Sequence, residues 1–168
     1  MSRPGFTLVE ILMVIALIGI LLSITSLQFS DYLNKDSIER QTKELYADLL
    51  ATRTVAVTQR TSKRIIVTPT DFTFISSALG GVSSVRTTKA ITKPVTWAGK
   101  SSVDTTAQIT FDERGTFDID VGNGSTTICV ASPLEQAQYD SVVVYSTRIH
   151  LGKIAFGEAC KSANVSVK

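Results

Sequence analysis

A single carboxylate, Glu10, stands at the start of a long apolar segment, and the residues around it set the chemistry that this chain can do. The run from Ile11 to Leu22 is uncharged, and the apolar stretch continues to Phe29. A charge in a membrane-length segment costs roughly 2.5–3.5 kcal/mol on insertion scales, so such a residue is expected to have a function. Helical residues from Ile11 to Phe29 would span roughly 28 Å, which matches the hydrocarbon thickness of a bilayer.

Two general interpretations of this N-terminus are open. A secretory signal peptide is the common explanation, but Glu10 interrupts the usual order of a basic region followed by an apolar core. Ser23 to Ser26 is the nearest candidate cleavage site, and it is a poor one. A plain membrane anchor would use Thr7 as the helix N-cap and Glu10 as its capping-box partner.

The hexapeptide Gly5-Phe6-Thr7-Leu8-Val9-Glu10, followed by the apolar run, resembles the type III signal of type IV prepilins and type II secretion pseudopilins. That signal has a short leader ending in Gly, an apolar residue after the cut, and Glu four residues beyond it. The resemblance implies cleavage between Gly5 and Phe6 by a prepilin peptidase on the cytoplasmic side, and N-methylation of Phe6. It also implies as partners an inner-membrane assembly platform, membrane lipid, and other pilins or pseudopilins that contact the N-terminal helix.

Within this resemblance Glu10 has a physical role in subunit assembly. After cleavage, Phe6 carries an α-ammonium group. A neighbouring subunit displaced along a filament axis would place its Glu10 near that ammonium inside an apolar bundle. Opposite charges attract strongly in a low dielectric, and either charge buried alone is heavily penalised. The pair would therefore set the stagger between subunits, as a buried polar residue sets coiled-coil register.

Downstream, an apolar stripe at helical spacing comprises Ile38, Leu45, Leu49 and Ala56. No Pro or Gly lies between Ile20 and Gln59, so we expect one helix of about fifty residues. The charged residues Glu39, Arg40, Lys43, Glu44, Asp48 and Arg53 are assigned to its solvated side. From Lys63 onward the period changes to that of strands. The expected strands cover residues 64–68, 72–76, 108–111, 116–121, 127–131, 142–146 and 149–154, with one more near 95–97 inside a variable excursion from 76 to 106.

The fold class is therefore α+β, a long N-terminal helix packed on a C-terminal antiparallel β-rich head, which is pilin-like. The expected domains are a leader (1–5), a transmembrane and assembly helix (6–29), its amphipathic continuation (30–60) and a periplasmic head (61–168). The resemblance places the chain in the inner membrane as a single-pass protein, and then in a filament.

A narrower resemblance comes from the head. The helix from Leu45 to Gln59, followed by strands and the hairpin Ile109 to Gly115, is similar to the H-type minor pseudopilins of type II secretion and the FimT-like minor pilins (the GspH/FimT family). We expect Gly115 in the left-handed region of this hairpin loop. The resemblance implies a minor subunit that helps to initiate or cap a periplasmic filament in type II secretion or type IV pilus assembly. Ser26-Leu27-Gln28 stands where many pilins have a helix-bending Pro, which also favours a minor subunit.

Two cysteines, Cys129 and Cys160, lie in the C-terminal third. An even pair beyond a membrane segment suggests an oxidising compartment and one disulfide, which would stabilise the head by roughly 3–4 kcal/mol in the chain-entropy model. Two buried free thiols are the alternative. The cysteine spacing, with His150 as the single histidine, fits no zinc site.

FimT-like pilins are associated with DNA uptake, so the basic residues offer a second hypothesis. Arg148 and Lys153 are the candidate DNA-binding residues, near Lys161 and Lys168, while Arg60, Lys63 and Arg64 form another cluster. Scattered solvated charges are favoured over a DNA-binding stripe, since the net charge is only +2 and the tail lacks a Gly-Arg-x-Arg signature.

The sequence contains no catalytic signature. It has no Gly-x-Ser-x-Gly or comparable nucleophile motif and no phosphate-binding glycine loop. His150 is interpreted as structural. Asp112, Asp118 and Asp120 could approach a calcium ion, but a solvated strand edge is favoured. We therefore expect a non-enzymatic protein without cofactor or metal.

Overall fold

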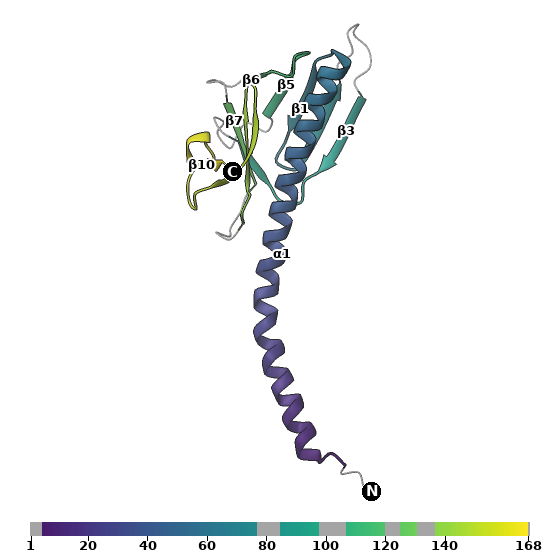
Figure 1. Ribbon diagram of the computed structural model, residues 1–168, viewed down its shortest axis with the longest axis vertical. Coiled ribbons are helices and arrows are strands. Elements are labelled where there is room, and N and C mark those ends of the chain that lie inside the picture. Colours follow the sequence, from purple (N-terminus) through teal and green to yellow (C-terminus); the bar gives the residue numbers. More distant parts are fainter. Residues whose placement is uncertain (1–4, 77–84, 98–106, 120–124, 131–136, 168) are drawn as a thin grey trace. The chain divides into compact units, whose positions relative to one another are not determined.

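The computed structural model describes residues 5–76, 85–97, 107–119, 125–130 and 137–167 (Figure 1). The chain divides by its contacts into two compact units, Met1–Lys35 and Asp36–Lys168. We call the first the N-terminal segment and the second the folded unit. The predicted α+β class is confirmed: a long N-terminal helix packs against antiparallel sheets in a pilin-like arrangement.

Helix α1 runs from Leu8 to Gln59, which confirms the prediction of one uninterrupted helix of about this length. The helix ends at Gln59, and the next residue, Arg60, is a non-glycine residue in the left-handed region, with a φ of 48°. The amide of Thr61 donates to the carbonyl oxygen of Ala56 at 3.2 Å, which satisfies one of the last carbonyl groups of the helix.

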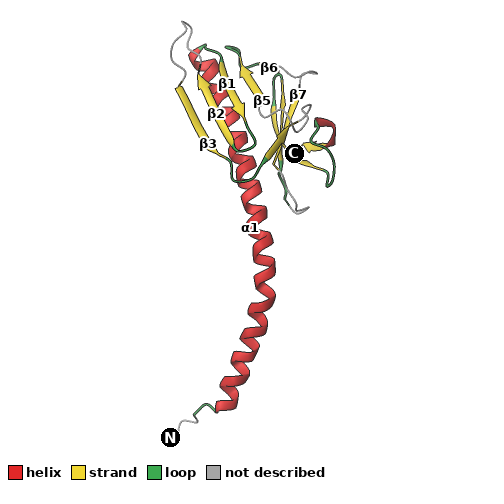
Figure 2. Cartoon of the chain, turned by 180° about the vertical axis from the view of Figure 1, so that it is seen from behind, coloured by secondary structure: helices red, strands yellow, loops and turns green. Residues whose placement is uncertain are grey.

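The first sheet contains five antiparallel strands in the order β3-β2-β1-β5-β6. Their bounds are β1 Lys63–Val67, β2 Asp71–Ser76, β3 Val85–Ala90, β5 Ala107–Phe111 and β6 Phe117–Ile119. Figure 2 shows β1, β2 and β3 lying across the last turns of α1. On β1, buried Ile65 and Val67 alternate with exposed Arg64, so one face of the sheet is buried and the other is solvated.

The second sheet is also antiparallel, in the order β10-β9-β8-β7-β4. Its strands are β4 Val95–Trp97, β7 Ser125–Val130, β8 Ser141–Tyr145, β9 Ile149–Ile154 and β10 Val165–Val167, with a short 3-10 helix η1 at Ser162–Asn164. Strand β7 is buried on both faces. Ile128 and Val130 join the core, and the alternating residues Thr127 and Cys129 face the other side.

One hydrophobic core joins α1 to both sheets. The predicted stripe is buried throughout: Ile38, Leu45, Leu49 and Ala56 are each at most 2% exposed. Side chains of β1, β5, β7 and β8 pack in the same cluster. Full burial of a large aliphatic side chain is worth roughly 1.5–3 kcal/mol. This stripe therefore explains why α1 joins the folded unit from Asp36 onward.

Two strands were not predicted from the sequence. Strand β3 has a polar composition, Val85-Arg86-Thr87-Thr88-Lys89-Ala90, which is typical of a loop. It lies at a sheet edge, where charged residues protect against unwanted pairing. Strand β10 is only three residues long and is also an edge strand. The other expected strands are present with small shifts of their ends, although residues 120, 121 and 131 lie outside the described residues.

Candidate functional site

The N-terminal site begins with Thr7, which caps α1. Its carbonyl oxygen accepts hydrogen bonds from the amides of Glu10 at 3.1 Å and Ile11 at 3.4 Å. Its side-chain oxygen accepts a longer bond from the Glu10 amide, at 3.4 Å. These contacts satisfy amides that an uncapped helix would leave open, so the Thr7 half of the predicted capping box is present. Glu10 lies in the first turn, where a carboxylate interacts favourably with the helix dipole.

The Gly5–Phe6 peptide bond lies ahead of the helix and is open to solvent. No heavy atom lies within 4 Å of the position that a Cβ would take at Gly5. Phe6 is 80% exposed. The fold of this chain therefore places no steric demand for glycine at position 5, and a requirement for Gly there would have to come from a partner that binds the segment.

The N-terminal segment exposes apolar side chains on every face of its helix. The exposed large apolar residues are Leu8, Val9, Ile11, Leu12, Met13, Val14, Ile15, Leu17, Ile18, Ile20, Leu21 and Leu22. Apolar surface of this extent marks a site of protein–protein or membrane contact. Glu10 is the acidic residue within this surface.

In the described part of the chain, no helix has the length and apolar character needed to cross a membrane.

The two cysteines form a disulfide. Cys129 on β7 is bonded to Cys160, which lies between β9 and η1 and is 31 residues away in sequence. The sulfur of Cys160 also lies 3.6 Å from the carbonyl oxygen of Thr127. Because Cys129 and Thr127 point away from the core, the bridge fastens the C-terminal segment over the outer face of β7. The same segment forms β10, whose Val165 packs against Gly152.

The structure does not bring the two candidate DNA-binding residues together. Arg148 closes the β8–β9 hairpin, where it exchanges backbone hydrogen bonds with Tyr145. Lys153 lies near the other end of β9, opposite Ser166 of β10. Five strand positions separate the pair by roughly 16 Å. Lys153 also lies near the buried carboxylate of Asp140. Burial raises the pKa of Asp140, and hydrogen bonds together with the charge of Lys153 offset only part of that rise.

The hairpin between β5 and β6 packs directly on the end of α1. Gly115 has a φ of 74°, which confirms the predicted left-handed position. A Cβ there would lie 2.7 Å from the Cγ2 atom of Val57 and 3.2 Å from the Nε atom of Arg53. Glycine is therefore required at position 115 for two reasons: the left-handed backbone conformation and the close approach of the helix.

Asp112 organises this hairpin. Its carboxylate accepts bonds from the amides of Arg114 at 3.0 Å and Thr116 at 2.8 Å, and from the Thr116 hydroxyl at 2.8 Å. Partial desolvation alone would raise the pKa of Asp112, but these hydrogen bonds outweigh it and leave the pKa below its ordinary value. Asp120, a second member of the calcium hypothesis, lies outside the described residues.

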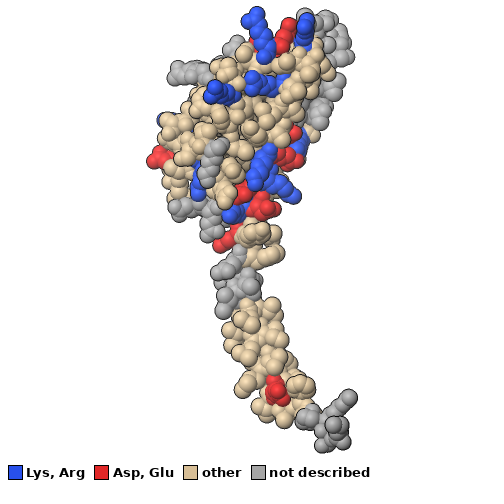
Figure 3. All heavy atoms as spheres, viewed as in Figure 1, with Lys and Arg blue, Asp and Glu red and all other residues tan. Residues whose placement is uncertain are grey.

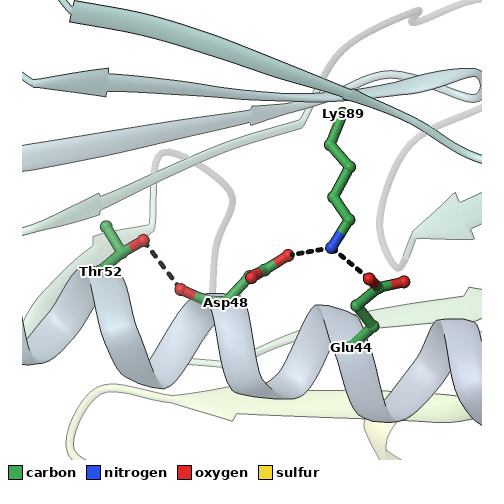
Figure 4. Close-up of polar contacts among 4 residues, drawn as sticks. All are labelled: Glu44, Asp48, Thr52 and Lys89. Carbon is green, nitrogen blue, oxygen red and sulfur yellow. Dashed lines mark hydrogen bonds and ion pairs between the residues drawn. The ribbon is translucent and has the colours of Figure 1, made fainter.

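The sequence assigned Glu44 and Asp48 to the solvated side of the helix, but in the structure both carboxylates form an ion pair with the same lysine. The ammonium group of Lys89 on β3 contacts Glu44 at 2.5 Å and Asp48 at 3.2 Å, so it links an edge strand to α1 (Figure 4). Burial alone would lower the pKa of Lys89, but the two carboxylates outweigh it and raise the pKa. The adjoining groove has a volume of about 30 Å³, which suits a water molecule and not an organic ligand.

A second unpredicted contact is a double hydrogen bond made by Gln41. Its side-chain amide donates to the carbonyl oxygen of Lys93 at 2.8 Å, and its oxygen accepts from the amide of the same residue at 2.8 Å. Glu39 accepts from the amide of Gln138 at 2.9 Å. These partners lie 52 and 99 positions away in sequence, so no local sequence signal could have found them.

The other candidate chemistry has a structural setting. His150 is half-buried on β9, and its ring packs edge-on against Tyr145 with centroids 5.9 Å apart. Among the described residues, no group of three or more His, Cys, Asp or Glu side chains is arranged to hold a metal ion.

Residues 1–26 match the family model described as the prokaryotic N-terminal methylation motif. No curated protein and no solved structure matches the chain. The motif is that of type IV pilin-like and pseudopilin-like proteins, and it implies processing by a prepilin peptidase. The chain thus carries this motif ahead of a pilin-like α+β fold, a combination that is generally structural and not enzymatic.

Proposed function

We propose that this protein is a minor pilin or pseudopilin, a structural subunit that helps to initiate or cap a periplasmic filament in type II secretion or type IV pilus assembly. The observation that carries the proposal is the exposed Gly5-Phe6 bond followed by Glu10 at the start of an apolar helix, within the matched motif. The pilin-like fold of the remaining chain supports it.

In this proposal a prepilin peptidase hydrolyses the bond between Gly5 and Phe6. The leader leaves with a carboxylate, and Phe6 gains an amino group that accepts a methyl group from the methyl donor of the processing enzyme. The new ammonium of one subunit then pairs with Glu10 of its neighbour. The exposure of both Phe6 and Glu10 is consistent with pairing between subunits.

The apolar surface of the N-terminal segment would be covered by lipid before assembly and by neighbouring helices afterwards. At about 25 cal/mol per Å², burial of such a surface supplies a large driving force for both states. The partners are therefore membrane lipid, an inner-membrane assembly platform and other pilins or pseudopilins. The disulfide is consistent with a folded unit located in an oxidising periplasm.

The narrower assignment to the GspH/FimT family rests on the hairpin and the helix. Gly115 of the hairpin packs against Arg53 and Val57 of α1. The hairpin and the helix, on which the resemblance depends, are therefore in direct contact. This packing supports an H-type minor subunit. The FimT-like alternative of DNA binding through Arg148 and Lys153 gains no support from their separation.

The test is the mass of the mature chain, expressed with a prepilin peptidase. We expect loss of residues 1–5 and one methyl group on Phe6. A Gly5→Val variant should remain unprocessed, and its fold should be intact because position 5 is open. A Thr7→Ala variant, which keeps the cleavage residues, serves as the matched control. A mature chain that begins at any other residue would refute the proposal.

The role of Glu10 requires a separate experiment. Glu10→Ala should leave membrane insertion unchanged and should abolish incorporation into sheared filaments, measured by immunoblotting of the membrane and filament fractions. Asp36→Ala removes another exposed carboxylate, in the folded unit, and should be incorporated normally. Normal incorporation of Glu10→Ala would remove the charge-pairing mechanism.

A further inference from the structure

Arginine side chains gather at one end of the folded unit, the end at which α1 terminates. They are Arg53, Arg60, Arg64, Arg114 and Arg148, and we call this group the arginine pole. Figure 3 shows Lys and Arg side chains at this upper end of the folded unit, and a second group lower down beside acidic side chains. The pole holds five of the eight arginines of the chain, so the grouping is marked.

Contacts between distant segments build the pole. The hairpin that carries Arg114 packs on α1, because Gly115 approaches Val57 and Arg53. The start of β1, the end of β5 and the start of β6 are neighbours in the first sheet. The amide of Phe117 on β6 donates to the carbonyl oxygen of Ser146 at 3.2 Å. The β8–β9 turn, which contains Arg148, therefore adjoins the start of β6.

Among the described residues, no ion pair involves an arginine of the pole, although the charge of Arg114 acts on the carboxylate of Asp112. The ion pairs in the described part of the chain all join Lys43 or Lys89 to carboxylates of α1, outside the pole. Three acidic residues lie on the elements that carry the pole: Asp112, Glu113 and Asp118, which the strand register places across β5 from Arg64. Asp112 is engaged by the backbone of its own hairpin, and Glu113 is exposed beside Arg114. Such a concentration of like charge opposes compactness, so it suggests a role in binding.

We propose that the arginine pole binds a second protein through a surface that carries carboxylates around an apolar side chain. Guanidinium groups bind carboxylates in a bidentate manner, and arginine is enriched at protein interfaces. Val57, which is 44% exposed beside Gly115, supplies an apolar contact within the pole. Exposed Glu113 would repel a continuous polyphosphate chain, whereas it can pair with a cation of a protein partner. This composition favours an acidic protein over nucleic acid.

The proposal concerns the folded unit and is independent of N-terminal processing. It can be tested with the full chain in detergent micelles and a labelled short peptide of alternating Glu and Leu, followed by fluorescence anisotropy. A Gln–Leu peptide controls for charge, and a DNA duplex of equal charge represents the nucleic-acid alternative. The pole variant is Arg60→Gln/Arg114→Gln/Arg148→Gln. The matched control, Lys35→Gln/Arg40→Gln/Lys161→Gln, has the same change in net charge but lies outside the pole.

We expect the unmodified chain to bind the Glu–Leu peptide and the pole variant to bind it about tenfold more weakly, since exposed charge pairs each contribute a modest amount. The control variant should lose about twofold or less. Urea unfolding of both variants should match the unmodified chain. Equal losses in both variants, equal binding of the Gln–Leu peptide, or absence of peptide binding would each overturn the proposal. Tighter binding of the duplex, lost only in the pole variant, would assign the pole to nucleic acid instead.

Discussion

The N-terminal segment and the folded unit use apolar residues in opposite ways. Leu12 in the segment is 58% exposed, whereas Leu49, on the same helix, is fully buried. The apolar residues of the segment are exposed along its helix, and in the proposed role lipid or another subunit covers them. Those of the folded unit hold α1 against two sheets. The same residue type is therefore left at the surface in one region and builds the core in the other.

The largest effect should come from comparing these two leucines. Leu49→Ala leaves a cavity in the core and should lower the free energy of unfolding by about 3–4 kcal/mol. Leu12→Ala should change it by less than about 0.5 kcal/mol, since its side chain is exposed. Urea unfolding in detergent micelles, followed by Trp97 fluorescence, measures both. A similar loss from Leu12→Ala would show that the two regions are not energetically separate.

The disulfide should come next. Cys129→Ser/Cys160→Ser should cost about 3 kcal/mol, because it frees the C-terminal segment that carries β10. Reduction of the unmodified chain should give the same loss, and the double variant should not respond to the reductant. Equal unfolding midpoints for the oxidised and reduced chains would contradict this expectation.

Two glycines separate backbone strain from packing. Both Gly115 and Gly157 have positive φ, but only Gly115 has the helix within contact distance. Gly157→Ala should therefore cost about 1 kcal/mol from the left-handed conformation alone. Gly115→Ala should cost about 2–3 kcal/mol, since it also collides with Val57. Equal unfolding free energies for the two variants would mean that the hairpin does not depend on its fit to α1.

The smallest effect concerns pH. Because the folded pKa of Asp112 lies below its unfolded value, its contribution is present above the unfolded pKa of about 3.9 and is lost as the pH falls through the folded pKa. Asp112→Asn should therefore cost about 1 kcal/mol at neutral pH and nothing in strong acid. Glu113→Gln, its exposed neighbour, should show little change. The measurement is the urea midpoint across pH, and a constant difference at every pH would disprove the link to ionisation.

The parts of this protein that were predicted correctly follow from local pattern. The helical stripe, the hairpin with Gly115 and the cysteine pair each depend on residue types and spacing that can be found in the sequence. The N-terminal motif is the extreme case, because its meaning lies in six consecutive residues that an external enzyme recognises.

The parts that were missed depend on contacts between distant segments. Strand β3 has the composition of a loop and becomes a strand because β2 pairs with it and Lys89 reaches the carboxylates of α1. The sequence grouped Arg148 with the C-terminal lysines. The fold instead joins its turn to β6, through the hydrogen bond from the Phe117 amide to the carbonyl oxygen of Ser146. Periodicity contains no information about such pairings.

The double hydrogen bond of Gln41 has a mechanical consequence. In the proposed role of a filament subunit, the chain would be pulled through its helix and held by its head, so tension would have to pass from α1 into the sheets. The side chain of Gln41 hydrogen-bonds to both the N–H and the carbonyl oxygen of Lys93, so a force along α1 would act on the two bonds at the same time. Lys89 shares the load with its two carboxylates farther along the helix. In that role, these contacts would make the first turns of α1 in the folded unit the place where force is transmitted, and the helix would slip only when several bonds break at once.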